Sequence, residues 1–404
     1  MATILVVGTL DTKGRELAYV RDVIRQQGHD TLLVDVGVHA PTVQPDISRE
    51  EVAEAGGVDV AGLAAIGDRG GAVTAMTKAA AAMVRNLFAE DRFQGIISLG
   101  GSAGTTIGTA AMQELPVGVP KVMVSTLASG DTRPYVGTKD ITMMYSVVDV
   151  SGLNRVSRSI LGNAAHAVSG MVAGSAAPPT EERDKPLIAA TMFGVTTPCV
   201  TLAREYLEGQ GYEVLVFHAT GSGGQAMEAL ISDGFVDGVL DITTTEWCDE
   251  LVGGVLAAGP HRLEAAALKG TPQVVSVGAL DMVNFGPRDS VPERFADRLF
   301  YQHNPTVTLM RTTPQECAEL GRIIAEKLNG TTGLTKLFIP LRGVSMIDAQ
   351  GQPFYDPGAD KALFDALRGH LRPGIERIEL DLNINDPEFA LAMAKELERM
   401  LHAD

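Results

Sequence analysis

The segment Gly100–Thr106, with the sequence GGSAGTT, directly follows an apolar run at residues 95–99. Glycine has no Cβ, so several backbone N–H groups can turn toward one ligand, and a helix beginning here would add the positive end of its dipole. This combination favours phosphate binding, although an ordinary turn between a strand and a helix would use the same residues. The segment matches neither the Walker A motif nor the GxGxxG fingerprint. The residues that we expect to bind the phosphate are Gly100, Gly101, Ser102, Gly104, Thr105 and Thr106.

Three other segments place glycine, hydroxyl or charged residues after an apolar run, where a phosphate group would also be held. The turn Gly8–Gly14 contains Lys13, which would meet a phosphate as a point charge or would be a solvated lysine at a helix start. The GSGG sequence at Gly221–Gly224 repeats the logic of the first segment without its threonines. The further candidates for cofactor binding are Thr9, Asp11, Thr12, Lys13, Ser125, Thr126, Gly221, Ser222, Gly223 and Gly224.

Carboxylates at or just beyond strand ends are the candidates for catalysis. Asp241, Glu246 and Asp281 occupy such positions, and each would act as a general base or bind a Mg²⁺ ion that phosphate oxygens also hold. A helix N-cap or a turn aspartate is an equally ordinary role for each of them. The sequence contains no HxxxH pair and no CxxC motif, so it predicts no zinc site and leaves the metal ligands unassigned.

These segments need strands that end close together, and the sequence predicts two sets of such strands. The first half opens with a strand at residues 4–8, then an amphipathic helix that stops at Gln27-Gly28, then a second strand. The second half opens in the same order, and its first helix stops at Gln210-Gly211. Two further strand segments match between the halves, which favours two copies of one doubly wound unit.

A linker candidate separates the two halves. Residues 174–186 combine small residues, a Pro-Pro pair and a cluster of charges, which is typical of a segment between domains. We therefore expect an N-terminal α/β lobe at residues 1–178 and a C-terminal α/β lobe at residues 186–404 that is a structural repeat of the first. The predicted fold class is α/β, with two doubly wound, Rossmann-like parallel-sheet lobes and a ligand cleft between them.

The composition excludes several other classes of protein. The 404-residue chain has a formal net charge of −17, which argues against nucleic acid or an anionic membrane as a partner, because both need basic patches. Hydrophobic residues make up 45% of the chain, which is too many for a disordered protein. Only three cysteines occur, and no secretory signal or membrane-spanning run is found, so the sequence predicts a cytoplasmic location.

Taken together, the motifs GTLDTKG, SLGGSAGTT, TMFGVTTPCV, VFHATGSGGQAME, LDITTTE and VGALDMVNFGP resemble one family over essentially the whole chain. It is the family named for the ATP-binding N-terminal domain of the tomato protein that confers resistance to tobamoviruses. The resemblance implies a pair of α/β lobes, Mg-ATP binding and a homo-oligomer, either a homodimer or a larger assembly. It places the nucleotide on the GGSAGTT segment and the GTLDTKG turn, and it implies no catalytic residue.

The sequence therefore predicts a nucleotide-binding protein with ATP and Mg²⁺ as cofactors. We expect an ATP-dependent enzyme that performs phosphoryl transfer or ligation on an unidentified small metabolite in the cleft between the lobes. Two alternatives remain open. The chain would otherwise be a non-catalytic, nucleotide-responsive regulatory or scaffold module, or it would bind another phosphorylated metabolite.

Overall fold

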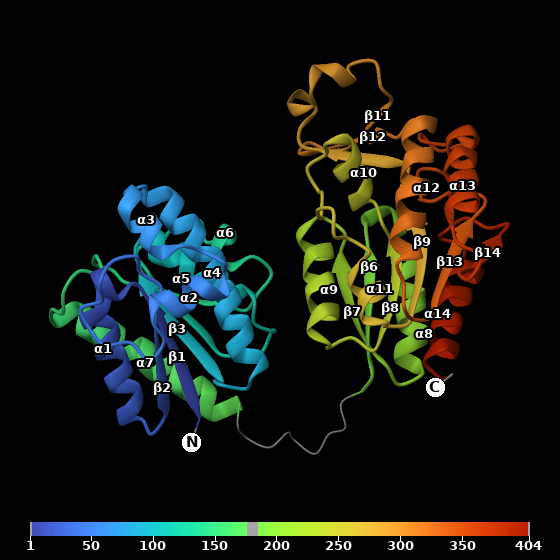
Figure 1. Cartoon of the computed structure of the whole chain (residues 1–404). Coiled ribbons are helices and arrows are strands. Elements are labelled where there is room, and N and C mark those ends of the chain that lie inside the picture. The colour runs from blue at the N-terminus through green and yellow to red at the C-terminus, as the bar shows by residue number, and fades with distance from the viewer. Residues whose placement is uncertain (1, 176–184, 403–404) are drawn as a thin grey trace. The chain divides into compact units, whose positions relative to one another are not determined.

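The computed structural model describes residues 2–175 and 185–402 of the chain. It divides into two compact units, Met1–Glu182 and Arg183–Asp404, each with its own parallel sheet (Figure 1). Residues 176–184, the middle of the expected linker, lie outside the described residues. Within the described ranges, no helix is both long enough and apolar enough to cross a membrane.

The first unit is built on five strands, which are β1 (Thr3–Gly8), β2 (Asp30–Asp35), β3 (Gly95–Gly100), β4 (Lys121–Ser125) and β5 (Thr142–Tyr145). They lie in the order β2-β1-β3-β4-β5, and every neighbouring pair is parallel. The strand that follows β1 in sequence lies on one side of it, and β3 lies on the other. The topological switch point of this doubly wound sheet is therefore between β1 and β3.

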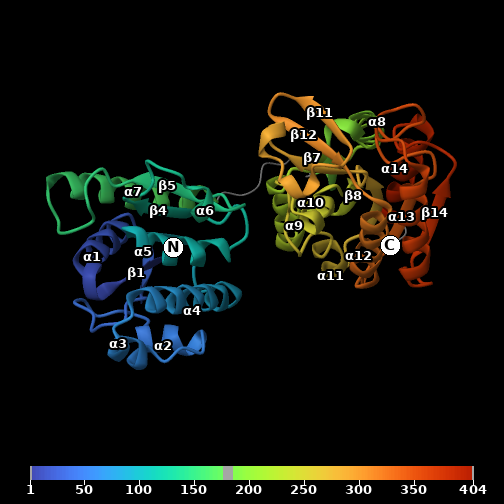
Figure 2. The ribbon, with the colours of Figure 1, turned by 90° about the horizontal axis from the view of Figure 1, so that it is seen from above.

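Helices cover both faces of this sheet, which gives three layers (Figures 1 and 2). One face is covered by α1 (Leu10–Gln26) and α7 (Arg155–Ser175). The other face is covered by α2 (Arg49–Ala55), α4 (Arg69–Ala89) and α5 (Ser102–Gln113). Two short helices complete the unit, namely α3 (Val60–Ile66) and α6 (Arg133–Val136).

The second unit contains a six-stranded parallel sheet of β6 (Leu187–Met192), β7 (Glu213–His218), β8 (Gly238–Thr243), β9 (Gln273–Gly278), β13 (Thr335–Pro340) and β14 (Glu376–Leu380). Its order is β14-β13-β9-β8-β6-β7. The first four strands in sequence are thus arranged as in the first unit, with the second, first, third and fourth side by side. The switch point of this sheet lies between β6 and β8.

Two layers of helices enclose the second sheet. On one face lie α8 (Thr197–Gly209) and α14 (Pro387–Leu401). The other face is covered by α9 (Ser222–Asp233), α10 (Glu246–Val252), α11 (Ala265–Lys269), α12 (Pro314–Asn329) and α13 (Pro357–His370). Three single-turn 3₁₀ helices also occur, η1 (Gly194–Thr196), η2 (Arg288–Ser290) and η3 (Glu293–Phe295).

A small antiparallel sheet of β10 (Met282–Phe285), β12 (Val307–Arg311) and β11 (Phe300–Asn304) also belongs to the second unit. The sequence patterns did not predict it. Every residue of β10 and all but the first of β12 are buried, so these short strands show no alternation of apolar and polar residues.

Local signals in the sequence set the starts of several helices. Ser48 and Glu51 form a capping box at the start of α2, in which the Glu51 carboxylate accepts from Ser48 N at 2.7 Å and Ser48 Oγ accepts from Glu51 N at 3.3 Å. Thr313 and Glu316 form the same arrangement at the start of α12. The predicted fold class, two Rossmann-like α/β lobes, is confirmed.

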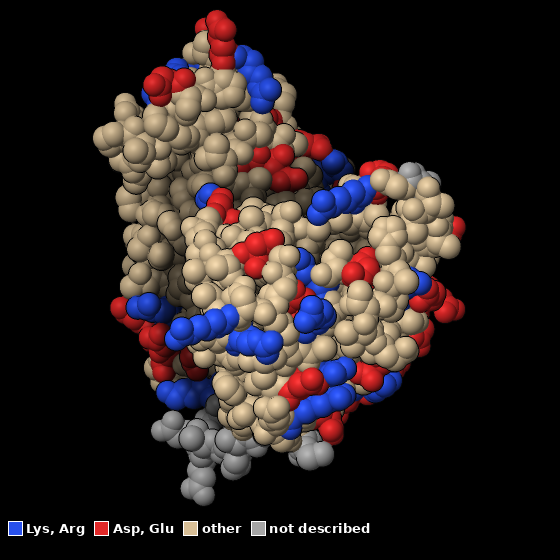
Figure 3. Space-filling view, turned by 90° about the vertical axis from the view of Figure 1, so that its left-hand side faces the viewer, with Lys and Arg blue, Asp and Glu red and all other residues tan. Residues whose placement is uncertain are grey.

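Charged side chains of both signs are interspersed over the face of the molecule that Figure 3 shows. Exposed charged side chains form ion pairs with neighbours in sequence, such as Arg133 with Asp131 and Arg204 with Glu208. Exposed pairs of this kind stabilise a protein by about 0–1 kcal/mol each. The charges that shape the structure are instead the buried ones described below.

Candidate functional site

A pocket of about 560 Å³ lies at the carboxyl edge of the first unit's sheet, where β1 and β3 end. Ligands of doubly wound sheets bind at this position, and the volume suits a small molecule. Five parts of the chain line the pocket, namely residues 9 and 11–13 after β1, residues 36–39 after β2, parts of residues 63–76 in and between α3 and α4, residues 100–104 and 107 around the start of α5, and Asp149.

The start of α5 forms a polar part of the wall. Gly100, Gly101, Ser102 and Gly104 all line the pocket, as the sequence predicts for a ligand-binding segment. Gly101 is the N-cap of α5 and has no side chain to bind the N–H groups of the first turn, so a ligand meets no competing cap there. A Cβ on Gly100 would lie 2.9 Å from Gly104 Cα, so the strand and the helix approach this closely only because Gly100 is glycine.

Four of the predicted hydroxyl residues support this segment from behind and are not part of the wall. Thr105 is buried, and its Oγ1 donates to Gly101 O at 2.8 Å and shares a hydrogen bond of 2.7 Å with Ser125 Oγ. Thr106 Oγ1 donates to Ser102 O at 3.0 Å. Thr126 Oγ1 is the nearest atom, at 3.8 Å, to a Cβ built on Gly101. These side chains fix the backbone that lines the pocket.

The N-cap and first turn of α1, directly after β1, bring a second predicted set to the same pocket. Thr9, Asp11, Thr12 and Lys13 all line it. Asp11 Oδ2 accepts from His39 N at 3.2 Å, whereas Asp11 Oδ1 is buried and has no hydrogen-bond partner among the residues that the structure describes. Leaving a buried carboxylate oxygen unpaired costs free energy, so this atom is where a ligand donor or a cation would bind.

Asp35, at the end of β2, holds two parts of the pocket wall together. It is fully buried, and its Oδ1 accepts from Leu10 N at 3.0 Å and from Gly37 N at 2.9 Å. Burial raises the pKa of Asp35, although the two N–H donors oppose this change. The sequence did not predict a role for Asp35, because its only local signal is its position at the end of an apolar run.

The pocket also has an apolar part of its wall and a second cation, and the sequence predicted neither of them. Leu63 of α3 and Val73 and Met76 of α4 line the pocket, together with Arg69, the first residue of α4. Their sequence shows only the apolar periodicity that any core helix has. Asp149 comes from the loop after β5 and was likewise not predicted.

The corresponding region of the second unit is filled by its own side chains. Gly221 N and Gly224 N, predicted to bind a phosphate, donate to Glu246 Oε1 at 2.7 Å and 3.1 Å. A Cβ on Gly224 would lie 2.2 Å from Glu246 Oε2, so glycine makes room for this carboxylate. Ser222 and Gly223 form the first turn of α9. The GSGG segment therefore holds an anion that belongs to the protein.

Arg262 pairs with that carboxylate and with two others. Its guanidinium donates to both oxygens of Asp241, at 2.6 Å and 2.7 Å, to Glu246 Oε2 at 2.8 Å and to Glu228 Oε1 at 3.1 Å. Arg262, Asp241 and Glu246 are each 1% exposed. Burial raises the pKa of Glu246, and Arg262 opposes this. Two predicted catalytic residues thus lie together inside a buried ion network, and their catalytic role stays a prediction.

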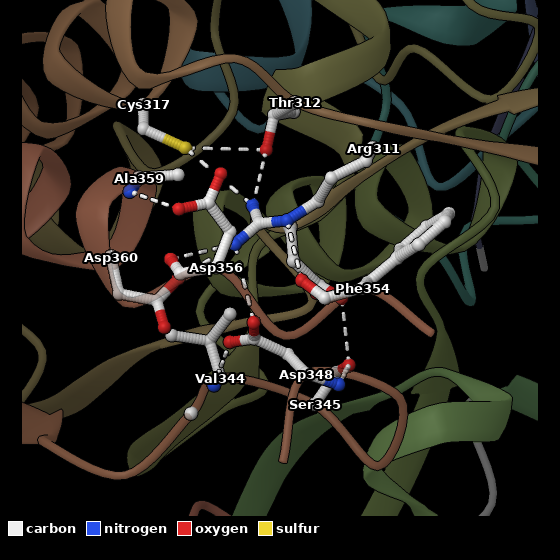
Figure 4. Close-up of polar contacts among 12 residues, drawn as sticks. Arg311, Thr312, Cys317, Val344, Ser345, Asp348, Phe354, Asp356, Ala359 and Asp360 are labelled. Carbon is white, nitrogen blue, oxygen red and sulfur yellow. Dashed lines mark hydrogen bonds and ion pairs between the residues drawn. The ribbon is translucent and has the colours of Figure 1, made fainter. Parts of the chain in front are cut away.

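Asp281, the third predicted catalytic residue, lies in a different buried cluster. It is fully buried, and Asp281 Oδ2 accepts from Ser345 Oγ at 2.8 Å. Arg311 is the cation of this cluster (Figure 4). The three candidates therefore lie in two separate buried clusters of the second unit.

Metal binding has a narrow basis in the structure. Among the described residues, no group of three or more His, Cys, Asp or Glu side chains is arranged to hold a metal ion. A Mg²⁺ ion that is held mainly by phosphate oxygens needs only one or two protein carboxylates. Asp11, with its unpaired Oδ1 in the pocket, fits that lesser role.

Comparison with known proteins gives matches over nearly the whole chain. The N-terminal domain of "Uncharacterised protein family (UPF0261)" matches residues 2–177, and the C-terminal domain of the same family matches residues 185–401. A UPF0261 protein of Clostridium tetani is 58% identical over 400 residues, which cover 98% of each chain. The ToMV resistance protein Tm-1(GCR237) of Solanum lycopersicum is 47% identical over 331 residues, which cover 80% of this chain and 44% of the tomato protein.

Similarity to solved structures is slight. A UDP-GlcNAc 2-epimerase of Methanocaldococcus jannaschii aligns with 91% of this chain and 100% of its own, at 8% identity and a TM-score of 0.23. A score this low carries no argument about the ligand. The tomato match does confirm the family resemblance that the motifs indicated.

Proposed function

The chain belongs to the uncharacterised protein family UPF0261, and from this premise we propose that the pocket of its first unit binds Mg-ATP. One observation carries the proposal. Residues 9–13 and 100–104 lie far apart in sequence, both were expected to hold phosphate, and they line the same pocket. The pocket also lies at the switch point of a doubly wound sheet, where nucleotides bind in other proteins of this architecture.

The pocket offers each part of ATP a matching wall. The phosphate groups would accept hydrogen bonds from the first-turn N–H groups of α5, and Lys13 and Arg69 would balance their charge. The adenine ring would lie on the apolar wall around Val73 and Met76. When Mg²⁺ is bound with the phosphates, it neutralises part of their charge, and Asp11 would hold it through Oδ1.

Calorimetric titration of the full chain with Mg-ATP tests the proposal. Gly101→Asp places a carboxylate beside the phosphates, and Gly101 has a φ of −81° and a free approach for a Cβ, so the variant should fold. We expect the wild type to bind saturably and this variant to lose at least about tenfold in affinity, from repulsion of about 1.4 kcal/mol or more. Gly170→Asp, on α7, makes the same change of charge where a Cβ meets no atom within 4 Å, and it should bind like the wild type.

Two results would contradict the proposal. The wild type would show no saturable heat with Mg-ATP, or Gly101→Asp and Gly170→Asp would weaken binding equally. A parallel titration with pyrophosphate separates a nucleotide from another phosphorylated ligand. If the apolar wall binds the base, Val73→Asp weakens ATP and leaves pyrophosphate binding unchanged.

Turnover of ATP would need a group near the phosphates that moves a proton or attacks phosphorus. Asp241, Glu246 and Asp281 are each no more than 1% exposed and belong to the second unit's ion clusters. Release of ADP or phosphate in the presence of small carboxylic acids would show turnover, and the catalytic role of these three buried residues stays a prediction.

A further inference from the structure

Four charged side chains meet in the interior of the second unit. Arg311, Asp281, Asp348 and Asp360 are 5%, 0%, 0% and 6% exposed. They come from four different segments, which are the end of β12, the turn between β9 and β10, the loop after β13, and α13. Figure 4 shows the guanidinium of Arg311 between the side chains of Asp348 and Asp360. The cluster thus fastens the small antiparallel sheet, the loop at residues 341–356 and α13 to one another.

The hydrogen bonds of this cluster join one cation, Arg311, to two of the three carboxyl groups. Arg311 Nη2 donates to Asp360 Oδ1 at 2.8 Å and to Asp348 Oδ1 at 3.2 Å, and its Nε donates to Phe354 O at 2.8 Å. Asp348 Oδ2 accepts from Val344 N at 2.9 Å. Asp281 Oδ1 is buried and has no partner within the described part of the chain.

Counting the charges shows that the three carboxyl groups cannot all be ionised at low cost. One guanidinium faces three carboxylates. The other titratable groups around them are Cys317 on α12, Cys248 on α10, Asp356 before α13 and the ion pair of Arg298 with Glu316, in which Arg298 Nη2 also donates to Arg311 O at 2.7 Å. None of these groups adds a net positive charge. Burying ions without a counter-ion costs several kcal/mol each, so the cluster is expected to take up a proton.

Asp348 is the group on which the proton belongs. Burial, together with the nearby Asp281 and Asp360, raises the pKa of Asp348 to about 9. Burial also raises the pKa of Asp360, but Arg311 opposes this. Asp348 and Asp360 both accept from Arg311 Nη2, so a proton on Asp348 removes the repulsion between two carboxylates that share one donor.

We propose that the Arg311 cluster is a proton-dependent lock, in which one proton on Asp348 lets Arg311 hold the loop at residues 341–356 and α13 together at neutral pH. Loss of this proton in alkaline solution leaves an additional buried negative charge and loosens the join. No ligand is needed for this behaviour, so the lock is independent of the pocket in the first unit.

The sign of the pH dependence follows from the direction of the shift. The ordinary pKa of aspartate is 3.8, so the unfolded chain releases the proton that the folded chain keeps up to a pH of about 9. The folded state binds more protons across this range, and its stability therefore falls as the pH rises. One extra bound proton makes the equilibrium constant for unfolding rise roughly tenfold for each unit of pH.

Trp247 allows the second unit to be followed in the intact chain. It is the only tryptophan, and it lies 5% exposed in the same core as Leu280, Cys317 and Val344. Denaturant unfolding would be measured by its fluorescence between about pH 6.5 and pH 7.5, where unfolded cysteines, whose ordinary pKa is about 8.5, stay mostly protonated. Asp348→Asn keeps a side-chain donor but has no proton to lose.

We expect the unfolding constant of the wild type to rise more steeply with pH than that of Asp348→Asn, by roughly tenfold for each unit of pH. Asp381→Asn is the matched control, because Asp381 pairs with Arg342 on the surface of the same unit, and it should follow the wild type. Equal slopes in the wild type and in Asp348→Asn would overturn the proposal.

A second measurement covers the case in which Asp348→Asn does not fold. Infrared spectroscopy of the wild type at neutral pH should show the carbonyl band of a protonated carboxyl group, and that band should be lost above a pH of about 9. A folded wild type with no such band at neutral pH contradicts the proposal without any variant.

Discussion

The two units share one strand order and differ in what occupies the switch point. In the first unit, the ends of β1 and β3 border a pocket of about 560 Å³. In the second unit, Asp241 of β8 and Arg262 occupy this position, and each is 1% exposed. Thr191 Oγ1 of β6 donates to Asp241 Oδ1 at 2.7 Å. The same topology thus gives an open site in one unit and a buried ion network in the other.

The two glycine-rich segments differ in whether a side chain of the protein supplies the anion. Both regions present glycine-rich backbone at the start of a helix, which favours an anion. Glu246 supplies that anion in the second unit, whereas no N-cap side chain binds the first turn of α5 in the first unit. A glycine-rich segment therefore predicts that an anion is bound, and the surrounding fold decides whether the anion comes from outside.

Removing Arg262 should have the largest effect on the stability of the second unit. Arg262→Met leaves Asp241, Glu246 and Glu228 without their shared cation, so we expect the second unit to lose about 3–5 kcal/mol of stability. Urea unfolding followed by Trp247 fluorescence measures this loss. Arg342→Met is the control, because Arg342 is 62% exposed in its pair with Asp381 and should cost less than about 1 kcal/mol. Similar losses in both variants would mean that the buried network contributes little.

Removing Glu246 tests whether the glycine segment of the second unit binds an anion from solution. Glu246→Ala leaves the N–H groups of Gly221 and Gly224 and part of the Arg262 guanidinium unpaired, which should cost about 2–3 kcal/mol. We expect added formate to restore part of the melting temperature of this variant while leaving the wild type unchanged. The absence of rescue, with formate and also with inorganic phosphate, would show that the glycine segment is not an anion site.

The smallest effect concerns Asp35 in the first unit. Asp35→Asn keeps an oxygen that accepts from Leu10 N and Gly37 N, so stability should stay within about 1 kcal/mol of the wild type. Burial raises the pKa of Asp35, so the wild type loses stability as the pH rises through that raised value, and the variant should lose less. Circular dichroism melting across that range of pH measures both effects.

Asp35→Ala removes both hydrogen bonds and serves as the comparison for that variant. We expect it to be less stable than Asp35→Asn and to bind Mg-ATP more weakly, because residues 9–13 and 36–39 of the pocket wall are no longer tied together. Equal behaviour of the two variants would show that Asp35 does not position the wall.

The sequence predicted features that depend on neighbours in the chain. The two parallel sheets and the glycine segment that follows β3 have local signals, and both are present. The partners of buried charges have no such signal. Arg262 follows Glu246 by 16 positions and Gly221 by more than twice as many, and nothing in their local sequence indicates that the three meet.

The pocket illustrates the same limit. Its glycines and Lys13 follow strands that the apolar runs reveal, so their positions could be predicted. Arg69 and Val73 come from helices whose sequences show only core periodicity, and Asp149 comes from a loop without a motif. Their place at the pocket depends on how α3, α4 and the loop after β5 pack on the sheet, which one sequence does not specify.

Every residue that lines the pocket belongs to the first unit, and this has a thermodynamic consequence. A molecule that binds only the native pocket adds to the stability of that unit by mass action, by about 2.7 kcal/mol when its free concentration is a hundred times its Kd. Trp247, in the second unit, does not report this gain directly. A melting profile of the whole chain should therefore separate into a ligand-sensitive transition and a ligand-insensitive transition. The ligand-insensitive transition of the second unit then serves as an internal reference when binding is measured.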